Sequence, residues 1–229
     1  MIEAIILAGG FGTRLREVVS DVPKPMAPIN GKPFLAYQLE NLAKNGVSRI
    51  ILSVGYMSEK IIEYFGNCYL GMEIVYVVED QPLGTGGAVK LAIQSCTQDH
   101  VYILNGDTFL DVDIATMEEL WMADREQIIL GVETDDVSRY GSLKVEGGYV
   151  VRFSEKSTIG RGLINAGCYL LDTNIFQKID CGSKFSLEKD YFDKIKNKKI
   201  FKVLINNGYF NDIGTPEGYR EIQEKFKKK

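Results

Sequence analysis

A glycine-rich segment that contains one arginine directly follows the first apolar run of the chain. Residues 7–15 read LAGGFGTRL and come after the mostly apolar residues 1–6. Glycines let backbone N–H groups approach an anion with no Cβ in the way, and the Arg14 guanidinium matches phosphate oxygens. The spacing is neither G-x-x-x-x-G-K-[ST] nor G-x-G-x-x-G, which excludes a P-loop and a dinucleotide fingerprint. The segment predicts a phosphate-binding turn, with an ordinary strand-to-helix turn as the alternative.

A lysine between two prolines follows within ten residues of Arg14. In Pro23-Lys24-Pro25 the prolines fix the backbone on both sides and remove two N–H donors. A solvated surface lysine is the usual interpretation, but such a lysine rarely lies between prolines. We therefore expect a functional role for Arg14 and Lys24.

Two aspartates follow strand-like runs. Asp107 lies in Asn-Gly-Asp-Thr after the apolar residues 101–104, and Asp212 lies in YFNDIGTP near the end of the chain. Either aspartate alone would fit a plain Asx turn. Together, two carboxylates suit Mg²⁺, which fills its remaining positions with water and substrate phosphates.

The first part of the chain alternates between strand-like and helical patterns. Strands are expected near residues 2–7, 49–54, 73–78, 101–104 and 127–133, and helices near 34–45, 59–65, 88–95 and 115–123. This alternation predicts βαβ units and a mostly parallel sheet covered on both sides. In such α/β folds the cleft lies at the carboxyl ends of the strands.

The pattern changes after about residue 135. A hairpin is expected around residues 146–148, followed by a strand at 163–171, helices near 173–178 and 187–196, a strand at 201–204 and a helix at 216–226. We expect one domain over residues 1–229. Within it, residues 1–135 and residues 136–229 would form the two sides of one cleft.

Composition excludes several classes of function. The net charge of −4 gives no field that would attract nucleic acid. No apolar run approaches the ~18 residues of a membrane span and no basic leader precedes the first strand, so we expect a cytoplasmic protein with no membrane partner. Four cysteines without a C-x-x-C pair and one histidine argue against a zinc site, a disulfide framework and a histidine-dependent triad. His100 is expected at a strand edge.

Three segments together resemble a known family. LAGGFGTRL, the following KPM and then GKPFLAYQLENL are similar to the sugar-nucleotide pyrophosphorylases of the nucleotidyltransferase family, and the similarity continues to the end of the chain. It is greatest for the short guanylyltransferases that act on D-glycero-α-D-manno-heptose 1-phosphate. The resemblance implies an α/β fold of the nucleotidyltransferase type, Rossmann-like, with three layers and a mostly parallel central sheet. It also implies GTP and a sugar 1-phosphate as substrates, with residues 1–135 as the nucleotide-binding part and residues 136–229 as the sugar-phosphate-binding part.

The resemblance assigns nucleotide-binding and metal-binding residues. The nucleotide-binding residues would be Leu7, Ala8, Gly9, Gly10, Gly12, Thr13, Arg14, Glu79, Gly84, Thr85 and Asp107. Mg²⁺ would be held by Asp107 and Asp212. The Glu79 carboxylate could accept hydrogen bonds from guanine N1–H and N2–H₂, which uracil and thymine do not offer as a pair, so Glu79 favours GTP. A solvated loop carboxylate is the alternative.

The acceptor side is assigned in the same way. The sugar-phosphate-binding residues would be Tyr140, Gly141, Glu155, Lys156, Asn165 and Gly167. Lys156 would bind the phosphate, and Glu155 and Asn165 would bind the sugar hydroxyls. The alternative for Glu155 and Lys156 is a charged hairpin end, and the alternative for Asn165 is a strand bulge. Glu188 and Asp190 follow Ser186, which favours helix capping over a role in the site.

The expected reaction is a metal-assisted nucleotidyl transfer. An oxygen of the sugar 1-phosphate attacks the α-phosphorus and pyrophosphate leaves, with Arg14, Lys24 and Asp107 as the catalytic residues. Alternatives within the family are a mannose-1-phosphate guanylyltransferase and a uridylyl-, thymidylyl- or cytidylyltransferase. A non-catalytic nucleotide-sugar sensor is disfavoured, because the charged motif residues are all present: Arg14, Lys24, Asp107 and Asp212. An NAD-linked dehydrogenase is disfavoured, because the G-x-G-x-x-G motif is absent. The sequence leaves a homo-oligomer open.

Overall fold

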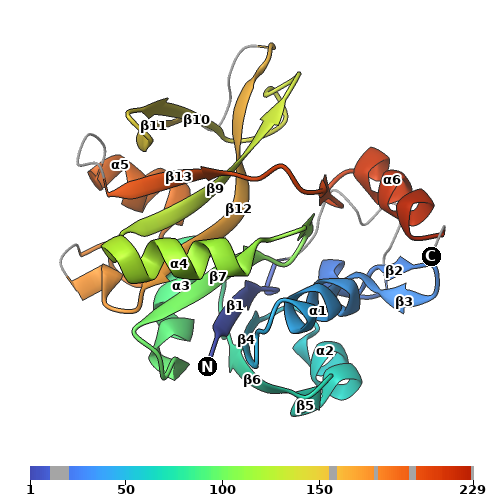
Figure 1. The fold of residues 1–229 in the computed structure, drawn as a ribbon. Helices are drawn as coiled ribbons and strands as arrows, with labels where there is room; N and C mark the ends of the chain where they lie inside the picture. Colours follow the sequence, from blue (N-terminus) through green and yellow to red (C-terminus); the bar gives the residue numbers. More distant parts are fainter. Residues whose placement is uncertain (11–20, 155–158, 178–179, 196–199, 228–229) are drawn as a thin grey trace.

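The first apolar run forms a central strand of the sheet. In this computed structural model, which describes residues 1–10, 21–154, 159–177, 180–195 and 200–227, β1 (Glu3–Leu7) pairs in parallel with β4 (Arg49–Val54) and β7 (His100–Asn105). Ala4, Ile5 and Ile6 are fully buried. A strand that is apolar on both faces is typical of a parallel sheet covered by helices. Figure 1 shows β1 between these two neighbours.

The elements have the following bounds. The other strands are β2 (Pro28–Ile29), β3 (Lys32–Pro33), β5 (Cys68–Tyr69), β6 (Met72–Val78), β8 (Thr108–Leu110), β9 (Gln127–Thr134), β10 (Ser142–Glu146), β11 (Tyr149–Ser154), β12 (Gly162–Asp172), β13 (Phe201–Ile205) and β14 (Phe210–Asp212). The helices are α1 (Phe34–Lys44), α2 (Ser58–Phe65), α3 (Gly84–Ala92), α4 (Ile114–Asp124), α5 (Phe192–Ile195) and α6 (Pro216–Lys227). A π-helical turn, Leu187–Tyr191, precedes α5, and short 3₁₀ turns lie at Lys24–Met26, Ile93–Ser95 and Ile175–Gln177.

The main sheet is mixed, which corrects the prediction of a mostly parallel sheet. Its strand order is β10-β11-β13-β9-β12-β7-β1-β4-β6-β5. The block β7-β1-β4-β6 and the pair β13–β9 are parallel, whereas β12 runs antiparallel to both of its neighbours, β7 and β9. Parallel neighbours need a crossover connection. The chain from β9 to β12 passes through the β10–β11 hairpin with no helix described between them, so β12 returns in the opposite direction.

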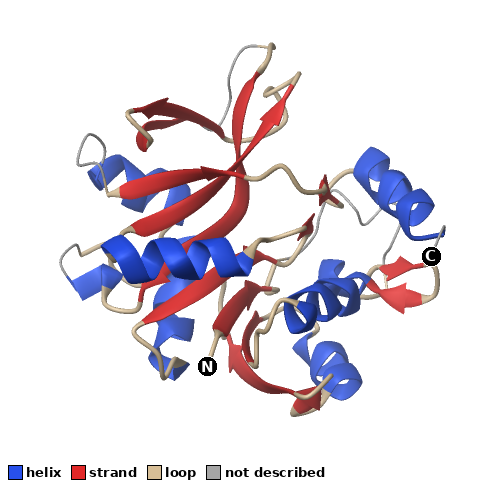
Figure 2. Cartoon of the chain, in the orientation of Figure 1, coloured by secondary structure: helices blue, strands red, loops and turns tan. Residues whose placement is uncertain are grey.

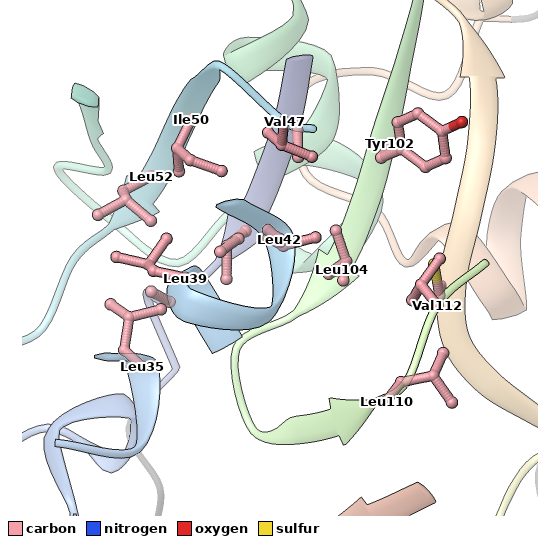
Figure 3. Close-up of a cluster of buried hydrophobic side chains, with 14 of the residues drawn as sticks. Leu35, Leu39, Leu42, Val47, Ile50, Leu52, Tyr102, Leu104, Leu110 and Val112 are labelled. Atoms are coloured by element: carbon pink, nitrogen blue, oxygen red, sulfur yellow. The ribbon is translucent and has the colours of Figure 1, made fainter. Parts of the chain in front are cut away.

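Helices cover both faces of this sheet. Figure 2 shows helices on either side of the central strands. On one face, Leu35, Leu39 and Leu42 of α1 pack against even-numbered strand residues such as Ile50 and Leu52, as Figure 3 shows. On the other face, α3, the π-helical turn and α5 pack against odd-numbered residues of the same strands, namely Ile5, Ile51, Ile103, Ile129 and Tyr169. The expected covering on both sides is therefore confirmed.

Several predicted elements have different bounds or a different form in the structure. The helix expected at 88–95 begins at Gly84 as α3. The helix expected at 173–178 is a 3₁₀ turn, Ile175–Gln177, with residue 178 outside the described residues. The helix expected at 187–196 starts as a π-helical turn. The short antiparallel pair β8–β14 was not predicted.

The remaining structural expectations concern His100, the cysteines and the membrane. His100 begins β7, is 7% exposed, stacks near Trp121 at 5.0 Å between ring centroids and contacts Asp99 and Glu118, so it has a structural place. All four cysteines are free. Over the part of the chain that the structure describes, no helix has the length and apolarity that a membrane crossing requires.

Candidate active site

A cleft of about 310 Å³ opens at the carboxyl ends of β1 and β7. It is lined by Leu7, Gly9, Gly10, Lys24, Pro25, Glu79, Pro82, Gly84, Thr85, Ala88, Asn105, Gly106 and Asp107. We call it the nucleotide cleft. All of its lining residues come from the first 107 positions, and its place agrees with the rule for open α/β sheets.

Lys24 reaches the nucleotide cleft from a rigid turn. Pro23 precedes the 3₁₀ turn Lys24–Met26, and the N–H groups of Met26 and Ala27 donate to the Pro23 and Lys24 carbonyls at 2.7 and 3.0 Å. The Lys24 ammonium lies 2.5 Å from Asp107 Oδ2, and its side chain is 13% exposed. The expected stiffening of this lysine is therefore present, and its charge is directed at a predicted metal ligand.

Hydrogen bonds from a side chain of α1 fix the turn that carries Asp107. The Gln38 amide is 3% exposed and its Nε2 donates to the Asn105 and Thr108 carbonyls at 2.9 and 2.6 Å. The Gly106 N–H donates to the Leu7 carbonyl at 3.0 Å, which fixes the turn to the end of β1. Sequence reasoning did not identify Gln38, because it lies on a helix face that otherwise looks like ordinary core.

Asp212 lies beside Asp107 although 105 positions separate the two in the sequence numbering. The two-strand ladder β8–β14 places Asp212 opposite Thr108, and the Ile213 N–H donates to the Asp107 carbonyl at 3.0 Å. A β-carbon placed on Gly214 would lie 2.7 Å from both Asp212 Oδ1 and Lys24 Nζ. The structure thus brings Lys24, Asp107 and Asp212 to one point, as the sequence predicted.

Glu79 also lines the nucleotide cleft. Its carboxylate accepts from the Ser53 hydroxyl at 3.0 Å and from the Leu83 N–H at 3.1 Å. A β-carbon on Gly9 would lie 2.7 Å from Glu79 Oε1, so the glycine turn and this carboxylate are adjacent. The remaining acceptor capacity of Glu79 is available to a ligand in the cleft.

Gly84 and Thr85, two of the predicted nucleotide-binding residues, lie in the first turn of α3. Gly84 has φ +75°, and a β-carbon there would lie 2.6 Å from the Phe185 carbonyl oxygen, so this position requires glycine. The N–H groups of Gly86 and Gly87 donate to that same carbonyl at 3.0 and 3.2 Å. These donors at the helix N-terminus are therefore already used within the protein.

A second cleft of about 400 Å³ adjoins the first, and we call it the acceptor cleft. It is lined by Thr85, Asn105, Asp107, Thr108, Arg139, Tyr140, Gly141, Phe153, Asn165, Ala166, Gly167, Glu188, Phe210 and Asp212. Thr85, Asn105 and Asp107 line both clefts. The predicted residues Tyr140, Gly141, Asn165 and Gly167 are brought together here. Burial, and secondarily the Asp212 carboxylate, raises the pKa of Tyr140.

Asn165 and Gly167 form the irregularity that was expected in this strand. The pairing of β12 with β9 shifts between Asn165 and Tyr169, and Gly167 has φ +67° with its N–H donating to Asn165 Oδ1 at 3.0 Å. Asn165 Nδ2 donates to the Tyr169 hydroxyl at 2.6 Å. The bulge aims the Asn165 amide at the acceptor cleft.

Some predicted site residues lie elsewhere. Gly12, Thr13, Arg14, Glu155 and Lys156 fall outside the described residues. Ala8 is fully buried and does not line the nucleotide cleft; its N–H donates to the Ser53 carbonyl at 2.7 Å. Seven residues that sequence reasoning did not assign to the site line the acceptor cleft: Asn105, Thr108, Arg139, Phe153, Ala166, Glu188 and Phe210. Glu188 follows Ser186 in a capping pattern, and that pattern gave no indication that its side chain lines the acceptor cleft.

The donor set fits a magnesium ion bound mainly through a substrate. Asp107 and Asp212 supply carboxylate oxygens at the junction of the two clefts. Within the described ranges, no group of three or more histidine, cysteine, aspartate or glutamate side chains is gathered as a metal cage. Two carboxylates with the remaining positions left to water and phosphate oxygens are the arrangement that Mg²⁺ prefers.

Comparison with known proteins covers nearly the whole chain. A family model described as Nucleotidyl transferase matches residues 3–229. D-glycero-alpha-D-manno-heptose 1-phosphate guanylyltransferase of Aneurinibacillus thermoaerophilus is 44% identical over 223 residues, which cover 97% of each chain. Mannose-1-phosphate guanylyltransferase of Mycobacterium tuberculosis is 33% identical over 95% of this chain and 62% of its own length. The crystal structure of HddC from Yersinia pseudotuberculosis complexed with GMP-PN has a TM-score of 0.88 at 41% identity, covering 99% of this chain and 100% of that one.

Proposed function

The chain belongs to the nucleotidyl transferase family, and on this basis we propose that it transfers GMP from GTP to D-glycero-α-D-manno-heptose 1-phosphate. The products are the GDP-sugar and pyrophosphate. The whole-length relatives named as guanylyltransferases of this heptose phosphate, and the related structure complexed with GMP-PN, support both substrates.

One observation carries this proposal: the two clefts meet at Asp107. The nucleotide cleft and the acceptor cleft share Thr85, Asn105 and Asp107. A triphosphate in the first cleft and a sugar 1-phosphate in the second would therefore have their phosphates at the same place. Residues 1–135 would hold the nucleotide, and residues 136–229 would supply most of the acceptor wall.

The reaction needs no protein nucleophile, because the attacking phosphate oxygen is already an anion at neutral pH. The protein has to bring two anions together and spread the charge of the transition state. Lys24 neutralises the reacting phosphates from its rigid turn, and Arg14 in the glycine-rich segment holds the leaving pyrophosphate. Gly9 and Gly10 let the phosphates approach the backbone closely.

Asp107 and Asp212 would hold Mg²⁺. When bound, the ion supplies positive charge to the phosphoryl oxygens. The backbone bond from Ile213 to Asp107 and the Gly214 N–H bonded to Asp212 Oδ1 at 2.6 Å keep these two carboxylates in place. Tyr140, Gly141, Asn165 and Gly167 bind the sugar, together with Glu155 and the phosphate-binding Lys156.

The base is read by Glu79. Its carboxylate is oriented by Ser53 and Leu83, and it lies next to Gly9 in the nucleotide cleft. The Thr85 hydroxyl does not contact the base edge, because it donates to Glu188 at 2.6 Å and accepts from the Leu187 N–H at 2.9 Å. The discrimination of guanine therefore depends on Glu79.

Pyrophosphate release over a grid of substrates tests the proposal. GTP, UTP, CTP, ATP and dTTP are each combined with the manno-heptose 1-phosphate, mannose 1-phosphate and glucose 1-phosphate. We expect a signal from GTP with the heptose phosphate, and a Glu79→Gln variant should lose the preference for GTP. A signal confined to mannose 1-phosphate would transfer the acceptor assignment to that sugar. Turnover with another base would refute the role of Glu79.

Two further expectations accompany the proposal. We expect the reaction to take place in the cytoplasm, and we expect neither nucleic acid nor a membrane as partner. A homo-oligomer stays open, and size-exclusion chromatography with light scattering measures the state directly.

A further inference from the structure

A series of hydrogen bonds connects the two clefts behind their shared wall. Thr85 Oγ1 donates to Glu188 Oε2 at 2.6 Å, the Tyr169 hydroxyl donates to Glu188 Oε1 at 3.1 Å, and Asn165 Nδ2 donates to the Tyr169 oxygen at 2.6 Å. Thr85 lines both clefts and Asn165 lines the acceptor cleft, whereas Tyr169 is fully buried. We call these four residues the relay.

The Glu188 carboxylate fixes the direction of every bond in the relay. An ionised carboxylate only accepts hydrogen bonds, so Thr85 and Tyr169 must both donate their single proton to it. Burial, and secondarily the Glu188 charge, raises the pKa of Tyr169 well above its usual value, so the phenol keeps that proton. The Tyr169 oxygen can then only accept, and its donor is the Asn165 amide.

This direction and the Gly167 N–H together determine how Asn165 faces the acceptor cleft. Its Nδ2 points to Tyr169 and its Oδ1 accepts from the Gly167 N–H at 3.0 Å. The opposite orientation of the amide would set two N–H donors against each other at Gly167. One N–H and one lone pair of Asn165 are left, each in a defined direction.

The turn before α5 holds Glu188 in this position. The Ser186 hydroxyl donates to Glu188 Oε2 at 3.0 Å, and the Leu187 N–H donates to Thr85 at 2.9 Å. The same turn therefore contacts a residue of the nucleotide cleft and supports a residue of the acceptor cleft.

We propose that Glu188 and Tyr169 are positioning residues that hold the Asn165 amide in a single orientation toward a sugar hydroxyl and connect that orientation to Thr85. This inference rests on the proposed function, because it takes the acceptor to be a sugar 1-phosphate. Tyr169 lines neither cleft, so it acts through Asn165. Glu188 sets the direction of the bonds through its charge.

Steady-state kinetics of Tyr169→Phe give the first test. The matched control is Tyr191→Phe. This substitution removes a buried hydroxyl that donates to the Ile175 carbonyl at 3.2 Å, and Tyr191 lines neither cleft. We expect KM for the sugar 1-phosphate to rise roughly tenfold in Tyr169→Phe, with KM for GTP unchanged and with both constants unchanged in Tyr191→Phe. Glu188→Gln should resemble Tyr169→Phe, because a glutamine amide can donate to Tyr169 and reverse the relay. An equal effect of Tyr169→Phe and Tyr191→Phe would overturn the proposal.

A double-mutant cycle gives the second test. Binding of the heptose 1-phosphate, in the presence of a non-hydrolysable GTP analogue, is measured by calorimetry for wild type, Asn165→Ala, Tyr169→Phe and the double variant. If Tyr169 acts through Asn165, its substitution has no further effect in the Asn165→Ala background. Additive losses would contradict the relay. Binding without any pyrophosphate release would refute the proposed function and leave the cycle to decide on the relay, whereas no binding by the wild type would overturn both.

Discussion

The Lys24 ammonium lies 2.5 Å from Oδ2 of Asp107, and the two residues are 83 positions apart in the chain. Lys24 comes from a proline-bounded turn and Asp107 from the end of β7, so two rigid segments meet at this ion pair. The pair lies where the nucleotide and acceptor clefts join. Its position indicates that charge is balanced at the point where the phosphates of both substrates would meet.

Removal of the Asp107 charge should abolish most of the activity without unfolding the protein. Asp107→Asn keeps the shape of the side chain but removes the carboxylate proposed to hold Mg²⁺ and the charged partner of Lys24. We expect kcat to fall at least ~100-fold, the size of effect seen when electrostatic stabilisation is removed from an active site. Asp111→Asn is the control, because Asp111 is exposed, follows β8 and lines neither of the two clefts. Near wild-type turnover in Asp107→Asn would contradict the assignment.

Lys24 and a divalent metal ion should compete for Asp107. In Lys24→Met the carboxylate loses its internal counter-charge, so the nucleotide-free protein should bind Mn²⁺ more tightly, by roughly tenfold, or ~1.4 kcal/mol. Electron paramagnetic resonance of free Mn²⁺ measures this binding independently of turnover. The same variant should lose activity, because methionine carries no positive charge that could neutralise the reacting phosphates. Unchanged or weaker Mn²⁺ binding would show that Asp107 does not hold the ion.

The position of Gly84 should tolerate no side chain. Gly84→Ala would combine a left-handed backbone with a β-carbon 2.6 Å from the Phe185 carbonyl, and we expect a loss of about 3 kcal/mol in the free energy of unfolding. Gly71→Ala is the matched control, because Gly71 has φ +79° but nothing within 4 Å of an added β-carbon. Its loss should be ~1 kcal/mol, from the backbone alone. Urea denaturation of both variants separates the two contributions, and equal losses would contradict the contact with Phe185.

The sequence predicted the separate parts of the site better than their connections. Lys24, Asp107 and Asp212 were each indicated by local patterns, since turns, prolines and strand ends leave a signal within a few residues, whereas Glu79 was assigned through the family resemblance. The ladder that joins Asp212 to the Asp107 turn consists of β8 and β14, which have three residues each and are too short to leave a periodic pattern.

Long-range contacts explain the remaining differences. The Thr85–Glu188 bond joins residues 103 positions apart, and no local pattern encodes it. Ser186 does cap the following turn, with its hydroxyl accepting from the Lys189 N–H at 3.2 Å, so the capping interpretation was correct but incomplete. The direction of β12 is defined by its antiparallel pairing with β7 and β9, which are distant in the sequence, and it could not be predicted from the apolar pattern of the strand. The strands of the parallel block, by contrast, were recognisable because apolar runs alternate with amphipathic helices.

Acid should destabilise the protein partly through Glu3. Burial alone would raise the pKa of Glu3, but hydrogen bonds from the Thr97 and Gln98 N–H groups, the Thr97 hydroxyl and Arg49 outweigh it and hold the pKa below its usual value. As the pH falls, the unfolded chain therefore takes up this proton first. The stabilisation is complete above the unfolded pKa of ~4.3 and is lost as the pH falls through the lower folded pKa.

The variant Glu3→Gln measures this contribution. The difference in Tm between wild type and Glu3→Gln should be constant from pH 7 to about pH 5 and should shrink below the unfolded pKa. A difference that grows as the pH falls would have the wrong sign for a lowered pKa.

GTP and a sugar 1-phosphate should react directly with each other at the junction of the two clefts. Rapid-quench measurement of pyrophosphate, with enzyme and GTP at comparable concentrations, distinguishes this direct transfer from a reaction through a covalent nucleotidyl-enzyme. We expect pyrophosphate to be released in one step only when the heptose 1-phosphate is present, and none to be released with GTP alone. A burst of pyrophosphate from GTP without the acceptor would show a nucleotide bound covalently to the protein and would contradict direct transfer.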